Sequence, residues 1–353
     1  MKLVTFSALA GRLDQGHPRQ GHRAGALIDG GGAVVDLAAA HASRWRQPAP
    51  QLESVLAIVE AGEAGLALCA DALGLARGAG AVVTRDQVAL AAPIPRPPQM
   101  RDFLCFEKHL VQAFQQARIV RSREHPDPER ALAEMERDGI LAVPRTWYER
   151  PIFYHPNRLD VVGDDADVVW PAYSTLMDFE LEFGVYIGRR GRDISAAAAR
   201  QHVFGYTIFN DFSARDEQTR EMPGQLGPGK GKDFDGSNAM GPCLVTADEI
   251  PDPYSLRMVV RVNGEEWGRG NTGEMRWRFE DCIAHVSRSE TLHPGEFFGS
   301  GTVGNGCGLE QMRFLSHGDV VELEVEGIGV LRNRVIRAPA SSHERSSHER
   351  SGA

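Results

Sequence analysis

Short runs rich in apolar residues and separated by turns, typical of β-strands, occur in both halves of the chain. The first part contains KLVTF, GALI and AVVDL, with a GGG turn before the last run, and later VVTRDQVALAAPI. The second part contains DFELEFGVYIG, FGYTIFND, LRMVVRVNGE and GDVVELEVEGIGVLRNRVI. The pattern predicts a mixed α+β protein in which strands outnumber helices, without the regular βαβ alternation of a Rossmann fold or α/β barrel.

Apolar residues at helical spacing occur in shorter segments between these runs. LESVLAIVEAGEAGLALCADAL is expected to form two short helices, because its central glycines disfavour one continuous helix. Further helices are expected at FEKHLVQAFQQAR, PDPERALAEMERDG, ISAAAARQHVF and FEDCIAHVSR. The charged segment from about Ile119 to Arg150 is compatible with an active-site cover and equally with a surface excursion.

A proline cluster, PRPPQM, divides the chain near residues 94–100, because proline continues neither a helix nor a central strand. We expect a small N-terminal β-rich domain at residues 1–97 and a larger domain at residues 98–338. The ending SSHERSSHER is a polar direct repeat with no apolar residues to bury. Residues 339–353 are therefore expected to form a disordered tail, and the tail histidines are excluded from the site.

Composition and charge favour a small-molecule ligand. The chain has 353 residues, 42% of them apolar, and a net charge of -9 from 39 basic and 48 acidic side chains. This balance attracts neither nucleic acid nor an anionic membrane surface. No run approaches the roughly 20 apolar residues of a membrane span, and the start lacks signal-peptide features, so a cytoplasmic location is expected. The cysteines are scattered without metal-binding spacing and are expected to be reduced and buried: Cys69, Cys105, Cys243, Cys282 and Cys307.

Two glutamates alternate with phenylalanines in the run Phe179-Glu180-Leu181-Glu182-Phe183. A strand directs alternate side chains to opposite faces, so both carboxylates are expected on one face. That face could simply be exposed to solvent, as in many antiparallel sheets. If the face is buried, the two carboxylates cannot both stay ionised without a compensating cation.

The run TIFNDFSARDEQ ends an apolar strand abruptly in polar residues. Asn210 and Asp211 close the strand, and Arg215, Asp216 and Gln218 follow. A strand end that presents an acid, a base and an amide is common in active sites, although an ordinary polar turn with a surface ion pair has the same composition.

Three further segments contain residues whose side chains could take part in catalysis or ligand binding. In RDFLCFEKH, Asp102 and His109 are seven residues apart, where two helical turns would place them on one side. QLGPGKGKDF brackets Lys230 and Lys232 with glycines, but its spacing does not match a nucleotide-binding P-loop. GSGTVGNGCGLE is a glycine-dense turn that ends in Glu310 and could also be merely a flexible loop.

Taken together and in this order, these motifs resemble the fumarylacetoacetate hydrolase family. The set comprises RDFxxFxxH, FELE, NDxSARDxQ, a GKxF lysine and an SGT turn that closes on LE, and it covers roughly residues 98–338. The resemblance implies an α+β fold with a fumarylacetoacetase C-terminal-like, mixed rolled β-sheet domain, preceded by the small N-terminal β-rich domain. It also implies a homodimer.

The resemblance implies one divalent metal ion. Four carboxylates suit a hard cation, with Mg²⁺ favoured and Ca²⁺ or Mn²⁺ as alternatives, and are a poor choice for structural zinc. A cation at this place would also meet the electrostatic need beside the paired glutamates. The matching ligands are Asp102, Glu180, Glu182 and Asp211.

The resemblance also implies catalytic and substrate-binding residues. His109 would take a proton from water while Glu310 orients its imidazole. The oxyanion donors would be Arg215, Gln218 and Lys232, and the substrate-facing residues Tyr154, Arg118 and Thr302. Two tyrosines of the family that contact substrate are replaced here, by Leu104 and Met222, which argues against fumarylacetoacetate itself.

The activity implied is hydrolysis of a carbon–carbon bond in a β-diketo acid, such as an acylpyruvate or a fumarylacetoacetate-like compound. The alternatives are decarboxylation, isomerisation or hydration of a 2-oxo acid, and a non-catalytic oxo-acid-binding protein. The presence of both His109 and Glu310 favours hydrolysis, because the pair would activate a water molecule.

Overall fold

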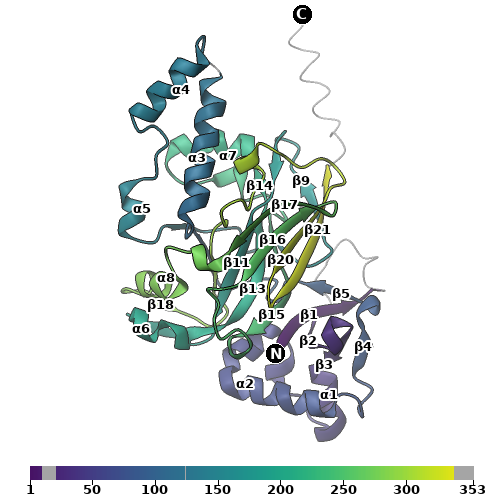
Figure 1. Ribbon diagram of the computed structural model, residues 1–353. Helices are drawn as coiled ribbons and strands as arrows, with labels where there is room; N and C mark the ends of the chain where they lie inside the picture. The colour runs from purple at the N-terminus through teal and green to yellow at the C-terminus, as the bar shows by residue number, and fades with distance from the viewer. Residues whose placement is uncertain (10–20, 124, 338–353) are drawn as a thin grey trace, which may run out of the picture.

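The structure, a computed structural model, describes residues 1–9, 21–123 and 125–337 (Figure 1). The tail predicted at 339–353 lies outside these residues. The largest sheet has 12 strands. Its main path is β4 (Val82–Thr84), β3 (Ala33–Asp36), β2 (Arg23–Ile28), β1 (Lys2–Ala8), β15 (Asn238–Thr246), β13 (Val203–Asp211), β11 (Leu181–Ile187), β19 (Phe297–Gly299), β6 (Met100–Phe103) and β7 (Phe153–Tyr154). Off this path, β5 (Val88–Ala91) pairs with β1 and β8 (Val161–Val162) with β15.

A second sheet has five strands, in the order β17 (Glu265–Asn271), β16 (Arg257–Val262), β20 (Val320–Val325), β21 (Gly329–Arg337) and β9 (Asp167–Trp170). Two short ribbons pair β10 (Met177–Asp178) with β14 (Ser213–Ala214) and β12 (Gly191–Arg192) with β18 (Thr291–Leu292). The helices are α1 (Leu37–Trp45), α2 (Val55–Leu75), α3 (Glu107–Ser122), α4 (Pro128–Arg137), α5 (Arg145–Glu149), α6 (Ala196–Ala199), α7 (Arg215–Glu221) and α8 (Phe279–Val286). The predicted α+β class is confirmed.

Strand β11 is buried on both faces, and this divides the core into two clusters. Phe183 and Val185 belong to the cluster that contains Val260 of β16 and Leu323 of β20. Tyr186, on the other face, belongs to the cluster that includes residues of β1, α1 and α2. The central strands are therefore covered by the second sheet on one face and by the N-terminal elements on the other.

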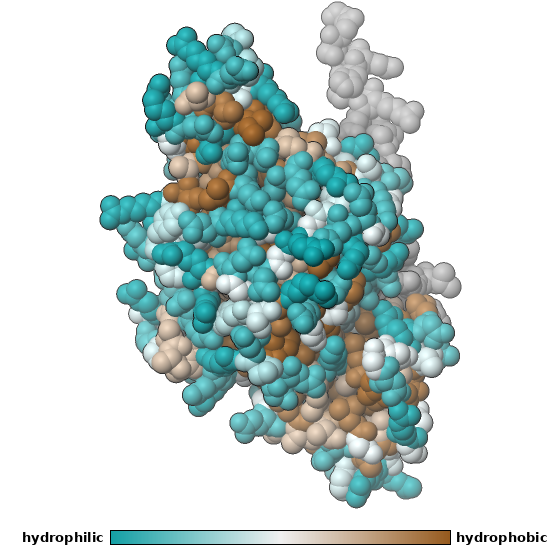
Figure 2. Space-filling view, viewed as in Figure 1, coloured by the Kyte–Doolittle hydropathy of each residue, from teal (hydrophilic) through white to brown (hydrophobic). Residues whose placement is uncertain are grey.

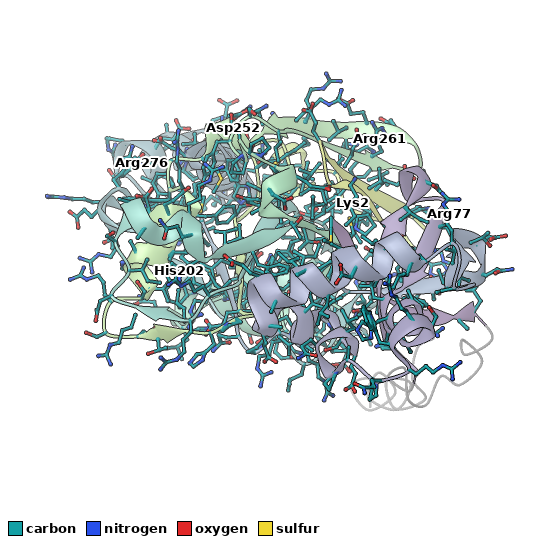
Figure 3. The ribbon with its side chains drawn as sticks, turned by 90° about the horizontal axis from the view of Figure 1, so that it is seen from below. Lys2, Arg77, His202, Asp252, Arg261 and Arg276 are labelled. Carbon is teal, nitrogen blue, oxygen red and sulfur yellow. The ribbon has the colours of Figure 1, made fainter. Side chains whose placement is uncertain are left out.

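The N-terminal strands continue the large sheet, because β1 pairs with β15 at Lys2↔Val245 and Leu3↔Leu244. In Figure 1 these elements lie at the lower end of the molecule, while α3, α4 and α5 extend beyond the sheets at the upper end. The view from below in Figure 3 shows α2 in front, with Arg77 near one end of the molecule and Arg276 near the other. That residues 1–97 form an independent domain stays a prediction.

The structure confirms one helix prediction and contradicts another. The backbone of α2 breaks at Gly62, which has φ 57, so the predicted division of this segment by glycine is confirmed. The expectation that Asp102 and His109 share one helix is wrong. Asp102 lies in β6, which pairs in parallel with β19, and His109 lies in α3, so sheet pairing overrides the helical spacing.

The face shown in Figure 2 is mostly hydrophilic, with apolar residues gathered around α3–α5 and over the N-terminal elements. Within the described ranges, no helix is long and apolar enough to cross a membrane. All five cysteines are free and buried, as predicted.

Candidate metal and catalytic site

Strand register brings acids from three strands to one place. In the antiparallel pair β11–β13, Leu181 lies opposite Asn210, so the glutamates on either side of Leu181 lie beside Asp211. On the other side of β11, Gly184 pairs with Gly299 of β19, and Gly299 pairs in turn with Asp102 of β6. The four predicted ligands, Asp102, Glu180, Glu182 and Asp211, are all buried.

Gly299 provides the space for the Asp102 carboxylate. A Cβ atom at Gly299 would lie 2.4 Å from Asp102 Oδ1, closer than real Cβ atoms approach other heavy atoms. The same oxygen accepts a hydrogen bond of 3.2 Å from the backbone N–H of Gly301. The absence of a side chain in β19 therefore allows Asp102 to turn inward beside β11.

Both faces of the Phe179–Phe183 run are buried, which excludes the alternative of a solvent-exposed acidic face. Phe179 and Phe183 are 1% and 0% exposed, and Glu180 and Glu182 are 5% and 0% exposed. Buried carboxylates require a proton or a positive charge beside them. The two glutamates meet this need in different ways.

Glu180 is neutralised by two side-chain cations. Lys232 Nζ donates to Glu180 Oε2 at 2.6 Å and to Asp211 Oδ2 at 2.7 Å, and Arg215 Nη2 donates to Glu180 Oε1 at 2.6 Å. Burial alone would raise the pKa of Glu180, but Lys232 and Arg215 hold it well below its ordinary value. Burial alone would lower the pKa of Lys232, but Asp211 and Glu180 raise it, so the ammonium stays charged.

Asp102 and Glu182 have no ion-pair partner among the described residues. Burial, reinforced by the neighbouring carboxylates, raises the pKa of Asp102 to about 8 and that of Glu182 well above its usual range. Burial also raises the pKa of Asp211 to about 6, although Lys232 opposes the shift. The group formed by Asp102, Glu182 and Asp211 therefore has too little positive charge beside it for all three carboxyl groups to ionise.

Two buried oxygens of this group, Glu182 Oε2 and Asp211 Oδ1, have no hydrogen-bond partner in the part of the chain that is described. One oxygen each from Asp102, Glu182 and Asp211 lie within 4.8 Å of one another. An all-oxygen set with unsatisfied lone pairs, and with carboxyl groups that would ionise only beside a positive charge, fits a hard divalent cation such as Mg²⁺. Glu180 stands apart from this group, because side-chain cations bind both of its oxygens.

His109 and Glu310 form a hydrogen-bonded pair beside the acids. His109 Nδ1 lies 3.0 Å from Glu310 Oε1, and Glu310 Oε2 accepts a hydrogen bond of 3.1 Å from the N–H of Cys307. Both side chains are buried, although 201 residues separate them in the chain. If Nδ1 carries the proton and donates it to Glu310, Nε2 is free to accept a proton.

The structure brings most of the other predicted residues to the same place. Tyr154 donates to Asp211 Oδ2 at 2.6 Å, Thr302 to Glu182 Oε1 at 3.5 Å, and Gln218 Oε1 accepts from Arg215 at 2.8 Å. Arg118 is different, because its guanidinium donates to the backbone oxygen of Leu141 in the segment between α4 and α5.

Sequence reasoning missed two buried residues next to the site. Asp178 bonds Arg215, and the Cys307 thiol belongs to a cluster with His109 and Glu310 in which the side-chain atoms lie within 4.8 Å of one another. A signal for Asp178 was present, since it continues the alternation of Glu180 and Glu182 by one step towards the N-terminus. No comparable signal in the sequence marks Cys307.

The fold and the site agree with one protein family. Residues 102–336 match the family model of the fumarylacetoacetate (FAA) hydrolase C-terminal domain, which is two thirds of the chain. The chain belongs to the fumarylacetoacetate hydrolase family, as the sequence motifs predicted.

Within this family, the chain is similar to proteins named as oxaloacetate tautomerases. The chain is 34% identical over 279 residues to the human mitochondrial oxaloacetate tautomerase FAHD2A, covering 79% of this chain and 78% of the relative. It is 32% identical over 339 residues to the Bos taurus protein of the same name, covering 95% and 92%. Among solved structures, the fumarylacetoacetate hydrolase of Exiguobacterium antarcticum matches with a TM-score of 0.66 and 24% identity, covering 96% of this chain and 100% of that one.

Proposed function

We propose that this protein is a metal-dependent tautomerase of a 2-oxo dicarboxylic acid of the oxaloacetate type. The observation that carries the proposal is the similarity to oxaloacetate tautomerases over almost the whole of both chains. This changes the preference reached from the sequence motifs, where carbon–carbon bond hydrolysis came first and isomerisation second.

The buried base pair fits proton transfer at carbon. In the keto form, the methylene carbon beside the ketone carries the acidic proton. His109 Nε2 would take this proton while Glu310 holds Nδ1, and the resulting imidazolium would return a proton to the enolate oxygen or to carbon. No water molecule needs to be activated in this reaction.

Asp102, Glu182 and Asp211 would hold the divalent cation, which when bound supplies positive charge to the 2-oxo acid and its enolate. The Lys232 ammonium donates to Glu180 Oε2 and to Asp211 Oδ2, so its charge is shared between these two carboxylates. Because the site is buried, few solvent molecules compete for these charges, and each electrostatic contact is stronger than in water.

Hydrolysis of a β-diketo acid is the second candidate, and the same His109–Glu310 distance of 3.0 Å favours it. A base that removes a carbon-bound proton is equally placed to activate water. By the motif resemblance, Leu104 and Met222 stand where the family has substrate-contacting tyrosines. Neither side chain can donate an O–H hydrogen bond, and Met222 is 49% exposed. The substrate is therefore expected to differ from fumarylacetoacetate.

The experiment is a pair of assays with the same enzyme, one following ketonisation of enol-oxaloacetate and the other cleavage of an acylpyruvate, each with Mg²⁺ or Mn²⁺ and with EDTA. Acceleration of metal-dependent ketonisation, corrected for the metal-catalysed background without protein, supports the proposal. Acylpyruvate cleavage without ketonisation would replace it with the hydrolase.

A further inference from the structure

Asp178 connects the base pair to the acidic cluster through four hydrogen bonds. Its Oδ1 accepts from the backbone N–H of Phe179 at 2.9 Å and of Gly308 at 2.8 Å. Its Oδ2 accepts from Leu309 N–H at 2.9 Å and from Arg215 Nε at 2.7 Å. Asp178 is fully buried, so these protein groups take the place of its hydration.

On one side, Asp178 fixes the backbone that presents Glu310. Gly308 and Leu309 directly precede this glutamate, and Leu309 begins the 3-10 helix Leu309–Gln311. A Cβ atom at Gly308 would lie 1.9 Å from the Arg313 oxygen and 2.6 Å from Asp178 Oδ1, so the backbone is in direct contact on both sides. A displacement of this turn would carry the Glu310 carboxylate with it.

On the other side, Asp178 is one of three anchors of Arg215. The guanidinium also donates to Glu180 and to Gln218. Without the Asp178 carboxylate, Arg215 would keep two of its three acceptors, whereas the N–H groups of Gly308 and Leu309 would lose the carboxylate acceptor that fixes them. The turn before Glu310 is therefore the part most sensitive to Asp178.

From this arrangement we infer that Asp178 is a positioning residue for the His109–Glu310 base pair. Both of its oxygens accept from protein groups and the residue is fully buried, so it would act through its protein neighbours and not on the substrate itself. It holds the turn at Gly308 and Leu309 so that Glu310 meets His109 Nδ1, and it ties this turn to Arg215 beside the acids. The inference rests on the proposed function in that His109 acts as the base.

A double-mutant cycle separates positioning from general structural damage. Asp178→Asn should lower kcat about ten- to a hundredfold, the usual scale for a residue that orients a functional side chain. In a His109→Ala background the same change should lower kcat by less than about threefold further. The effects of two substitutions are not additive when both act through the same base pair. A full tenfold further loss in that background would overturn the inference.

Asp36→Asn is the matched control. Asp36 is also a buried aspartate that pairs with an arginine, Arg23, and accepts from a backbone N–H, that of Ala39, but it lies in the N-terminal elements. It should lower the melting temperature and leave kcat within about twofold of wild type, since stability effects away from the site rarely reach the chemistry. A tenfold loss of kcat in Asp36→Asn would overturn the inference, because kcat would then follow stability alone.

A measurement without turnover keeps the test independent of the proposed function. In wild type, the His109 Nδ1 proton bonded to Glu310 should give a downfield NMR resonance, assigned by its loss in His109→Ala. Asp178→Asn should shift or remove this resonance, as should Gly308→Ala, which displaces the same turn and serves if Asp178→Asn does not fold. An unchanged resonance in the folded variant would overturn the inference, whereas absent tautomerase activity with a lost resonance would reject only the proposed function.

Discussion

At the scale of single residues, the acids of the site differ in what balances their charge, and this predicts how stability depends on pH. Burial raises the pKa of Asp102 to about 8 and of Asp211 to about 6 in the metal-free protein. A raised carboxyl pKa means that the folded state binds the proton more tightly than the unfolded chain, where the pKa is about 4. The stability from this proton is full below about pH 4 and is lost as the pH rises to about 8.

A divalent cation competes with these protons, so its stabilising effect should grow over the upper part of the same window. The gain in melting temperature on adding Mn²⁺, relative to EDTA, is expected to rise from about pH 5.5 to about pH 8, because this range spans the pKa values of Asp211 and Asp102. Thermal unfolding at fixed ionic strength measures it. A gain that stays constant across this range would mean that Asp102 and Asp211 do not release protons to the metal.

The base pair gives a second residue-scale prediction. His109→Ala or Glu310→Gln should lower kcat by about a hundredfold or more, the scale for losing a general base. Mn²⁺ affinity, measured by calorimetry, should stay within about threefold of wild type, because neither residue belongs to the acidic group of the metal site. His202→Ala is the control, because it removes an imidazole whose Nδ1 bonds the Arg189 backbone oxygen, away from the acids. Loss of Mn²⁺ binding in His109→Ala would make His109 a ligand.

At the scale of elements, strand packing predicts that Gly299 is required for the metal site. Gly299→Ala would place a methyl group 2.4 Å from Asp102 Oδ1, so Asp102 or β19 must shift. We expect Mn²⁺ affinity to fall about tenfold or more, the scale seen when a ligand's surroundings change. Gly74→Ala in α2 adds its methyl group in open space and should be neutral or slightly stabilising. Equal Mn²⁺ affinities in the two variants would contradict the packing argument.

How far the sequence predicts these elements depends on the distance over which each signal acts. The alternation at Glu180 and Glu182 is local and correctly places both carboxylates on one side of a strand. The spacing of Asp102 and His109 misleads, because the parallel pairing of β6 with β19, about 200 residues away in the chain, decides the backbone of Asp102. The family motifs identify these residues, but the role of Gly299 as space beside Asp102 follows only from the packed strands.

At the scale of the whole molecule, the N-terminal elements share a hydrophobic core with the strands that carry the acids. Leu3 and Ile58 belong to the same buried cluster as Tyr186, Phe209 and Leu244. Elements that share a core unfold together, so the full chain is expected to show one cooperative calorimetric transition, with equal calorimetric and van't Hoff enthalpies. Two separate transitions would instead support an independent domain at residues 1–97.

We propose that enolate chemistry on a 2-oxo acid occurs at the buried carboxylate cluster and depends on a divalent cation. The most direct test is exchange of the methylene protons of oxaloacetate with deuterium, followed by NMR with Mn²⁺-free Mg²⁺ or with EDTA, and corrected for exchange without protein. Wild type should accelerate exchange only with Mg²⁺, and Glu182→Gln should lose most of this acceleration while remaining folded. Acceleration that persists in EDTA, or is unchanged in Glu182→Gln, would contradict a metal-dependent reaction at this cluster.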